Sequence, residues 1–331
     1  MKIAGHLTCE RFDECIKSAQ LMEKAGYTRL WVVDSQMLWE DAYIYGAYAL
    51  AKTSRIQWGT ALSNPITRHY SVSASAAATL ASIHPGRVIL GLGRGDSAVR
   101  TLGYKPLSTS KIEPVLHRTK KLLAGEEVDE GGTKIVLRWW KNGSQVPLMY
   151  GATGPANLKI GGRVADIVML QVGTHPAAVE WAISHVHEGA REAGRNPKDV
   201  EIALLCGLWV SEDRRESRDA CRWAASCATN HLEDVAKAGH ADDMPKVLRE
   251  VLAKKRAHYD YYAGHLDSQA DHSEYLSDEM IDNFSINGTS QECLRKIKVL
   301  KDLGVDELSS AYLNGHFQQI ERIGKEIIPF I

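Results

Sequence analysis

Eight predicted strands that alternate with helices indicate an α/β fold, a (β/α)8 barrel of the TIM type, for this 331-residue chain. Apolar strands begin near residues 3, 29, 56 and 88, which is the spacing of a repeated strand–helix unit. Each helix in this half is followed within a few residues by the next strand, as parallel α/β units require. Polar and glycine residues follow the carboxyl ends of the strands, where a barrel carries its ligand site. We expect a single domain over residues 1–331.

The first half of the chain is predicted to form four strands with three helices between them. The helix that ends at Gly26 is amphipathic, and glycine commonly ends helices. The strands are Lys2–Leu7, Arg29–Val33, Ile56–Leu62 and Val88–Leu92, and the helices are Glu10–Ala25, Ala42–Lys52 and Ser71–Ile83.

In the second half of the chain the predicted strands are spaced further apart along the sequence. Ala124–Val146 is predicted to form a hairpin-like insertion. The polar segment 211–287 is interpreted as a helical insertion between strands seven and eight, without a further apolar strand. The remaining strands are Pro147–Tyr150, Ile167–Leu170, Glu201–Val210 and Glu307–Leu313, and the helices are Pro155–Val164, Ala177–Ala193, Ser290–Leu303 and Phe317–Ile327.

Composition excludes several classes of function. With 40 basic and 41 acidic side chains the net charge is −1, so we expect neither a nucleic-acid nor a membrane partner. No stretch contains 18 uninterrupted apolar residues, and the N-terminus lacks the layout of a signal peptide. The six cysteines form no CxxC pair, which favours reduced thiols in a cytoplasmic protein.

The stretch Arg87–Arg100 carries the clearest local signal of a ligand site. A short apolar strand breaks into Gly91-Leu92-Gly93-Arg94-Gly95, where glycines permit positive φ and close approach to a ligand. Asp96 and Ser97 follow, and both suit the cap of a helix. The stretch is typical of a ligand site at the end of a parallel strand, and a tight turn with a surface cap is an equal alternative.

Chemistry-bearing residues follow most of the predicted strands at their carboxyl ends, and the opposite ends carry no comparable set. This asymmetry predicts a site at one face of the barrel. Thr153-Gly154-Pro155 begins a helix whose N-terminus suits a phosphate or carboxylate. His6 and His69 are candidate catalytic residues. The strand ends are His6, Asp34–Gln36, Ser63–His69, Arg94–Ser97, Gly151–Pro155, Gln171–His175 and Asn314–His316.

A metal site is the alternative that these His and Asp residues raise. The sequence contains no HExxH, and His185 and His187 would point apart on a helix. We therefore expect no metal, and keep a metal-assisted hydrolase on the same barrel as an alternative function.

Four segments resemble the bacterial luciferase-like superfamily of flavin- or deazaflavin-dependent monooxygenases and oxidoreductases, with the closest likeness to its methylenetetrahydromethanopterin reductase-like branch. The tail GTSQECLRKIKVLKDLGVDEL also fits the family. The resemblance implies a TIM-type barrel with an insertion after strand seven, and FMN or coenzyme F420 in the barrel mouth. The four segments are WVVDSQMLWEDAYIYGAYAL, GTALSNPITRHYSVSASAAATL, HPGRVILGLGRGDSAVRTLG and YGATGPANLKIGGRVAD.

The resemblance also assigns roles to residues. It implies a non-proline cis peptide within Ala61-Leu62-Ser63 that backs the cofactor ring, and it makes Asp96 an acid or base. Related dehydrogenases have His directly after the second-strand Asp, where this chain has Ser35, so His6 or His69 would replace it. The residues expected to bind the cofactor are Asp34, Ala61, Leu62, Ser63, Asn64, Arg94, Gly95, Gly151, Thr153, Gly154 and Gly173.

The sequence thus predicts an oxidoreductase that acts on a small organic substrate. With F420 the reaction would be hydride transfer, and with FMN it would be monooxygenation, with a separate flavin or F420 reductase as a possible partner. Trp39 and segment 211–287 either cover the substrate or pack as ordinary core. We expect a homodimer, and a non-catalytic flavin-binding protein on the same fold is the other alternative.

Overall fold

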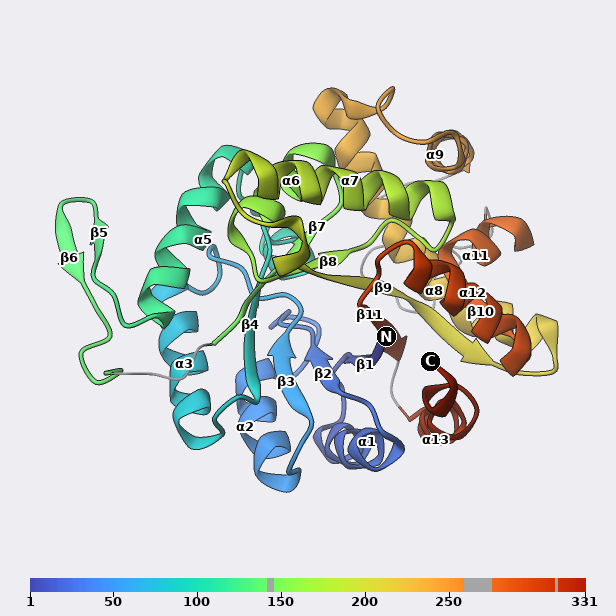
Figure 1. Cartoon of the computed structure of the whole chain (residues 1–331), viewed down its shortest axis with the longest axis horizontal. Helices are drawn as coiled ribbons and strands as arrows, with labels where there is room; N and C mark the ends of the chain where they lie inside the picture. The colour runs from blue at the N-terminus through green and yellow to red at the C-terminus, as the bar shows by residue number, and fades with distance from the viewer. Residues whose placement is uncertain (142–145, 259–275, 313–314) are drawn as a thin grey trace.

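Eight parallel strands close into a barrel in the computed structural model, which describes residues 1–141, 146–258, 276–312 and 315–331 (Figure 1). Strand β9 pairs with both β8 and β11, and β11 pairs with β1, so the sheet has no open edge between them. The predicted fold class is confirmed. The barrel strands are β1 (Lys2–Leu7), β2 (Arg29–Val32), β3 (Gln57–Thr60), β4 (Val88–Leu92), β7 (Leu148–Ala152), β8 (Ile167–Leu170), β9 (Glu201–Val210) and β11 (Glu307–Tyr312).

Helices surround the strands on the outside of the barrel (Figure 1). Helix α5 (Thr109–Leu123) has no counterpart in the sequence-based expectation, and it contains Pro114, which disfavours a helix interior. The other helices of the ring are α1 (Phe12–Ala25), α2 (Ala42–Lys52), α3 (Tyr70–Ile83), α4 (Ser97–Arg100), α6 (Pro155–Val164), α7 (Pro176–Glu192), α12 (Ser290–Asp302) and α13 (Phe317–Glu326). Two short 3-10 turns are η1 (Pro197–Asp199) and η3 (Ile328–Phe330).

The chain between β9 and β11 is mostly helical in its described part. No further apolar strand occurs in the described part of 211–287, but a short polar strand that the sequence did not predict, β10 (Ser285–Gly288), pairs in parallel with the end of β9. Only Ile286 is a large apolar residue in β10, so the strand carries no hydrophobic pattern. Residues 259–275 lie outside the described residues, and the assignment of 211–287 as an insertion stays a prediction. The other elements are α8 (Arg214–Val235), the π-helix η2 (Ala236–His240), α9 (Lys246–His258) and α11 (Asp278–Phe284).

The segment 124–146 contains the predicted hairpin. Strands β5 (Val128–Glu130) and β6 (Thr133–Ile135) pair antiparallel. Gly131 and Gly132 form the turn with φ of 61° and 89°, conformations that favour glycine. The hairpin projects away from the barrel (Figure 1).

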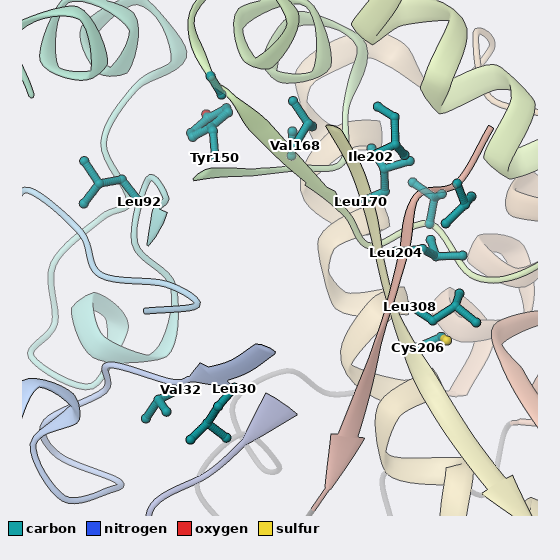
Figure 2. Close-up of a cluster of buried hydrophobic side chains, with 14 of the residues drawn as sticks. Leu30, Val32, Leu92, Tyr150, Val168, Leu170, Ile202, Leu204, Cys206 and Leu308 are labelled. Atoms are coloured by element: carbon teal, nitrogen blue, oxygen red, sulfur yellow. The ribbon is translucent and has the colours of Figure 1, made fainter. Parts of the chain in front are cut away.

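Alternate side chains of the strands build two separate apolar regions. Side chains such as Leu30, Val168 and Leu204 point outward and pack under the helices (Figure 2). Others fill the barrel, and these are Ala4, Trp31, Ala61, Ile89, Met149, Ile167, Met169 and Ala203. The amino end of the barrel is closed by charged side chains from the first residues of their strands: Arg29 Nη1 lies 3.0 Å from Glu307 Oε2. Among the described residues, these side chains close the amino end, so a ligand would approach the barrel from its carboxyl end.

Candidate active site

A cavity of about 880 Å³ opens at the carboxyl ends of the barrel strands. Its wall is formed by loops that follow the strands and by one face of α8. Most of the residues that the sequence singled out line it, namely His6, Asp34, Ala61, Leu62, Asn64, Arg94, Gly95, Asp96, Gly151, Thr153 and Gly154. Ser63, His69 and Gly173 are not part of its lining.

The floor of the cavity is built around Leu62. The Ala61–Leu62 peptide bond is cis, which confirms the expectation for residues 61–63. A Cβ added to Gly151 would lie 2.3 Å from Leu62 Cδ1, and one added to Gly93 would lie 2.7 Å from the same atom. Leu62 therefore fills space that only glycine leaves open on the two neighbouring strands. The result is an apolar platform that suits a flat ring.

Asp34 follows β2 and lines the cavity, and its carboxylate is fixed by neighbouring polar side chains. The Ser63 hydroxyl donates to Asp34 Oδ2, and Arg68 Nε lies 3.4 Å from the same oxygen. The Tyr43 hydroxyl lies 2.9 Å from Ser63 Oγ. Ser63 is fully buried, so it acts through Asp34 and does not line the cavity. Asp34 is therefore available as a fixed hydrogen-bond acceptor.

Asp96 lies in an ion pair that joins two walls of the cavity. Arg100 Nε lies 2.7 Å from Asp96 Oδ1, and Arg100 Nη2 lies 2.7 Å from Asp234 Oδ2 on α8. Asp96 is the N-cap residue of α4, as the sequence predicts, but its side chain makes no cap hydrogen bond and pairs with Arg100 instead. Ser97 is the first residue of α4, and its Oγ lies 2.9 Å from Ser35 Oγ. The arrangement leaves Asp96 as an oriented carboxylate.

His6 projects into the cavity from β1. Burial lowers its pKa to about 4, so the imidazole is neutral at neutral pH. Its Nδ1 is buried and has no hydrogen-bond partner among the residues that the structure describes. A buried polar atom of this kind normally has a partner, and a ligand in the cavity would supply one.

Two sequence candidates lie elsewhere. His69 is exposed at the start of α3, where its Nδ1 accepts a hydrogen bond from the Ser71 N–H, so its position is that of a helix cap. Gly173 has φ of 80° and packs against Phe284 of α11, where an added Cβ would lie 2.9 Å from the ring. The geometry brings neither residue to the cavity, and we leave both out of the site.

The first turn of α6 contributes backbone to the cavity. Gly154 is the N-cap and Pro155 the first helical residue, as the sequence predicts. The N-terminus of a helix favours an anion, so a phosphate is still expected here. Gly154 also faces α8, since an added Cβ would lie 2.9 Å from Val235 Cγ2.

The face of α8 toward the cavity lies within segment 211–287, which the sequence offers as a cover for the substrate, but none of its individual residues was predicted as part of the site. Its lining residues recur every three or four positions, which is the period of one helix face. That spacing was legible in the sequence, but it did not say what the face would contact. These residues are Asp219, Arg222, Trp223, Ser226, Cys227, Asn230, His231, Asp234 and Val235. Glu10 and Trp39 also line the cavity, and Trp39 Nε1 donates a hydrogen bond to Glu10 Oε1 at 3.2 Å.

Two classes of feature are absent from the described ranges of the chain. In those ranges, no three His, Cys, Asp or Glu side chains gather closely enough to hold a metal ion. Every helix there is too short or too polar to cross a membrane.

A parallel barrel with a cavity at its carboxyl face, an apolar platform and a fixed carboxylate defines a TIM-barrel protein whose site has room for a flat ligand. The luciferase-like monooxygenase family model matches residues 2–307, so the chain belongs to this family. This confirms the resemblance found in the sequence. The chain is accordingly an oxidoreductase of a family whose members use F420 or FMN.

Relatives of known function cover nearly the whole chain. A 5,10-methylenetetrahydromethanopterin reductase of Methanolobus tindarius is 30% identical over 324 residues, which are 94% of each chain. The coenzyme F420-dependent tetrahydromethanopterin reductase of Methanopyrus kandleri has the same fold, with a TM-score of 0.79, 22% identity and coverage of 100% and 99%. The oxygenating constituent of 3,6-diketocamphane monooxygenase from Pseudomonas putida, solved with FMN, has a TM-score of 0.68, 17% identity and coverage of 100% and 99%.

Proposed function

We propose that this chain is an F420-dependent oxidoreductase that transfers hydride to the methylene carbon of a tetrahydropterin-type substrate. The observation that carries the proposal is the cavity floor, where Leu62 lies between Gly93 and Gly151 and offers a platform for a planar ring. The choice of substrate class is supported by the 30% identity to a methylenetetrahydromethanopterin reductase along 94% of both chains. Ser35, in place of the His of related dehydrogenases, weighs against simple alcohol oxidation.

The residues present fit such a cofactor. The platform of Leu62 would support the ring, while Asp34 and Asn64 would accept or donate hydrogen bonds at its edge. The first turn of α6, with Thr153 and Gly154, would hold a phosphate through backbone N–H groups. F420, when bound, supplies hydride chemistry at the C5 carbon of its ring.

Two groups of this chain would act on the substrate side. His6 is neutral at working pH, so its imidazole can donate or accept one hydrogen bond without changing charge. The Asp96 carboxylate is oriented by its ion pair with Arg100. Asp96 is therefore suited to hold a substrate N–H or to act as an acid or base toward the substrate.

Flavin chemistry is the competing function, since the fold is shared with an FMN-bound monooxygenase. The test is to titrate the protein with F420 and with FMN, following the fluorescence of each. Reduced F420 and 5,10-methylenetetrahydromethanopterin are then mixed without oxygen. We expect tighter binding of F420 and return of the oxidised F420 absorbance. Tighter binding of FMN, with oxygen consumption after its reduction by a separate flavin reductase, would replace the proposal with monooxygenation.

We also propose that two copies of the chain associate through α2 and α3. These neighbouring helices expose Ile44, Tyr48, Val72 and Ile83, each at least half exposed. Charge is nearly lacking there, since α3 has no charged residue and α2 has only Lys52. An exposed apolar face of this kind is typical of a protein interface. Light scattering should give the mass of a dimer, and Ile44→Glu with Ile83→Glu should give a monomer; a monomeric wild-type chain would contradict this.

A further inference from the structure

Helix α8 turns a mostly polar face to the cavity, and several of its side chains are already engaged with other groups of this chain. Asp234 is paired with Arg100, at 2.7 Å. Asp219 and Arg222 are paired with each other, at 3.2 Å. Asn230, one turn before Asp234, lines the cavity between these pairs.

Asn230 is oriented by a buried lysine on α9. Lys255 Nζ donates to Asn230 Oδ1, and only 3% of Lys255 is exposed. An ammonium group has donors and no acceptor, so it must face the amide oxygen and not the amide nitrogen. The two N–H donors of Asn230 are therefore not used by Lys255, and Asn230 itself lines the cavity. Burial lowers the pKa of Lys255 to about 8, and the ammonium form still predominates at neutral pH.

This part of α8 lies close to the predicted reaction centre. The Arg100 guanidinium bridges Asp234 to Asp96, so the turn that carries Asn230 and Asp234 is tied to the loop after β4. The Asp96 charge also reaches Cys227, one turn before Asn230, where with burial it helps to raise the pKa of the thiol. A ligand group that touches Asn230 would therefore lie on the substrate side of the cavity, across from the platform.

We propose that Asn230 is a specificity-determining residue whose amide N–H groups bind a carbonyl oxygen or unprotonated ring nitrogen of the substrate. Lys255 is a positioning residue that keeps those donors facing the cavity. The inference rests on the proposed function, because it takes the substrate to be a heterocycle that carries such acceptors. A substrate that offered only donors at this position would leave the Asn230 N–H groups unpaired, which is costly in a buried site.

The test uses the full chain with F420 and 5,10-methylenetetrahydromethanopterin. Asn230→Asp keeps the size and the contact with Lys255 but replaces donors with an acceptor. We expect KM for the pterin to rise roughly 10- to 100-fold, with kcat changed much less, from loss of hydrogen bonds in a buried site. Pterin binding to the complex with oxidised F420, measured by calorimetry, should weaken by a similar factor. The affinity for F420 itself should stay within about twofold.

Lys255→Met tests the positioning role, with Lys255→Arg as the conservative variant. We expect Lys255→Met to weaken pterin binding roughly 3- to 10-fold, and Lys255→Arg to restore most of it, because a guanidinium also has only donors. Lys254→Met, on the exposed side of the same helix, is the matched control and should change nothing. Melting temperatures identify any variant that fails to fold, in which case Asn230→Asp alone decides.

The outcomes separate the two proposals. Unchanged pterin affinity in a folded Asn230→Asp variant would overturn the role of Asn230. A loss of F420 affinity in that variant would place Asn230 on the cofactor and would also overturn it. A wild-type chain that does not bind F420, or binds it without converting the pterin, would instead refute the proposed function, and the inference would fall with it.

Discussion

Single atoms decide whether this cavity can receive a flat ring. Leu62 Cδ1 occupies the place of the side chain that Gly151 lacks, and Gly93 leaves room for the same atom from the next strand. Neither glycine needs positive φ here, so their value is space and not backbone freedom. Gly93 and Gly151 therefore act by admitting the Leu62 side chain to the floor of the site, whereas Gly95 has a φ of 91°, as the sequence predicts for this motif.

Gly151→Ala should damage this floor. The added methyl group would lie 2.3 Å from Leu62 Cδ1, so Leu62 or the backbone must move. Overpacking of this kind costs about 1–3 kcal/mol of stability. We expect a lower melting temperature together with weaker F420 binding, measured by thermal unfolding and fluorescence titration.

The double variant Gly151→Ala with Leu62→Ala checks the cause. Removing the Leu62 side chain makes room for the new methyl group, so the two effects on stability should not add. Strictly additive losses would mean that the contact between these two residues is not what matters.

At the scale of elements, regular patterns were predictable and local irregularities were not. The bounds of α2, β4, α6, β8 and β9 match the expectation because each has a clear apolar period and a clear stop. Helix α5 was not predicted, and it contains Pro114, which disfavours a helix interior. Strand β10 was not predicted because its four residues show no hydrophobic period.

The residues of the candidate site likewise separate into those that the sequence predicts and those that it does not. The glycines, Asp34 and Asp96 follow strands, and the barrel topology alone brings the ends of parallel strands to one face. The face of α8 comes from chain more than 100 residues further on, and its placement depends on packing that no local pattern records. The pairing of the Asp96 side chain with Arg100, in place of a side-chain cap hydrogen bond, depends on the same packing, since Asp234 is the other partner of that guanidinium.

Arg100 should couple these two elements functionally. Arg100→Met removes both ion pairs, which are half-exposed and worth about 0–1 kcal/mol each to stability. The effect on catalysis should be larger, because Asp96 loses its fixed orientation. We expect kcat/KM to fall by roughly tenfold or more with little change in melting temperature, as steady-state kinetics and calorimetry would record.

Arg118→Met is the matched control for that variant. Arg118 lies 3.4 Å from Glu130 in an ion pair of similar exposure, and neither residue lines the cavity. Equal losses of activity in the two variants would contradict a specific role for Arg100.

At the scale of the whole molecule, the barrel is open at one end and sealed at the other. The seal is polar: Glu307 is fully buried, accepts a hydrogen bond from Trp31 Nε1 at 2.7 Å and pairs with Arg29. Burial raises the pKa of Glu307 from 4.5 to about 7 in spite of the Arg29 charge. The sealed amino end of the barrel thus contains a carboxyl group with a pKa near neutral pH.

This titration links stability to pH. Because the folded pKa lies above the unfolded value of 4.5, the folded state holds a proton that the unfolded state releases. The contribution of this proton to the free energy of unfolding is fully present below about pH 4.5. It decreases as the pH rises toward about 7, by at most about 3 kcal/mol in all. Glu307→Gln keeps an acceptor for Trp31 and cannot titrate. We therefore expect the free energy of unfolding of the wild type, minus that of Glu307→Gln, to decrease across this range in urea unfolding series.

Other carboxyl groups titrate over the same range, so the comparison needs a second variant. Glu180→Gln changes an exposed residue of α7 and removes one carboxyl group without touching the barrel floor. The free energy of unfolding of the wild type, minus that of Glu180→Gln, should change little between pH 4.5 and 7. If the Glu307→Gln difference is equally flat, the pKa of Glu307 is the same in the folded and the unfolded chain. The Arg29 charge would then fully offset the cost of burial at the sealed end.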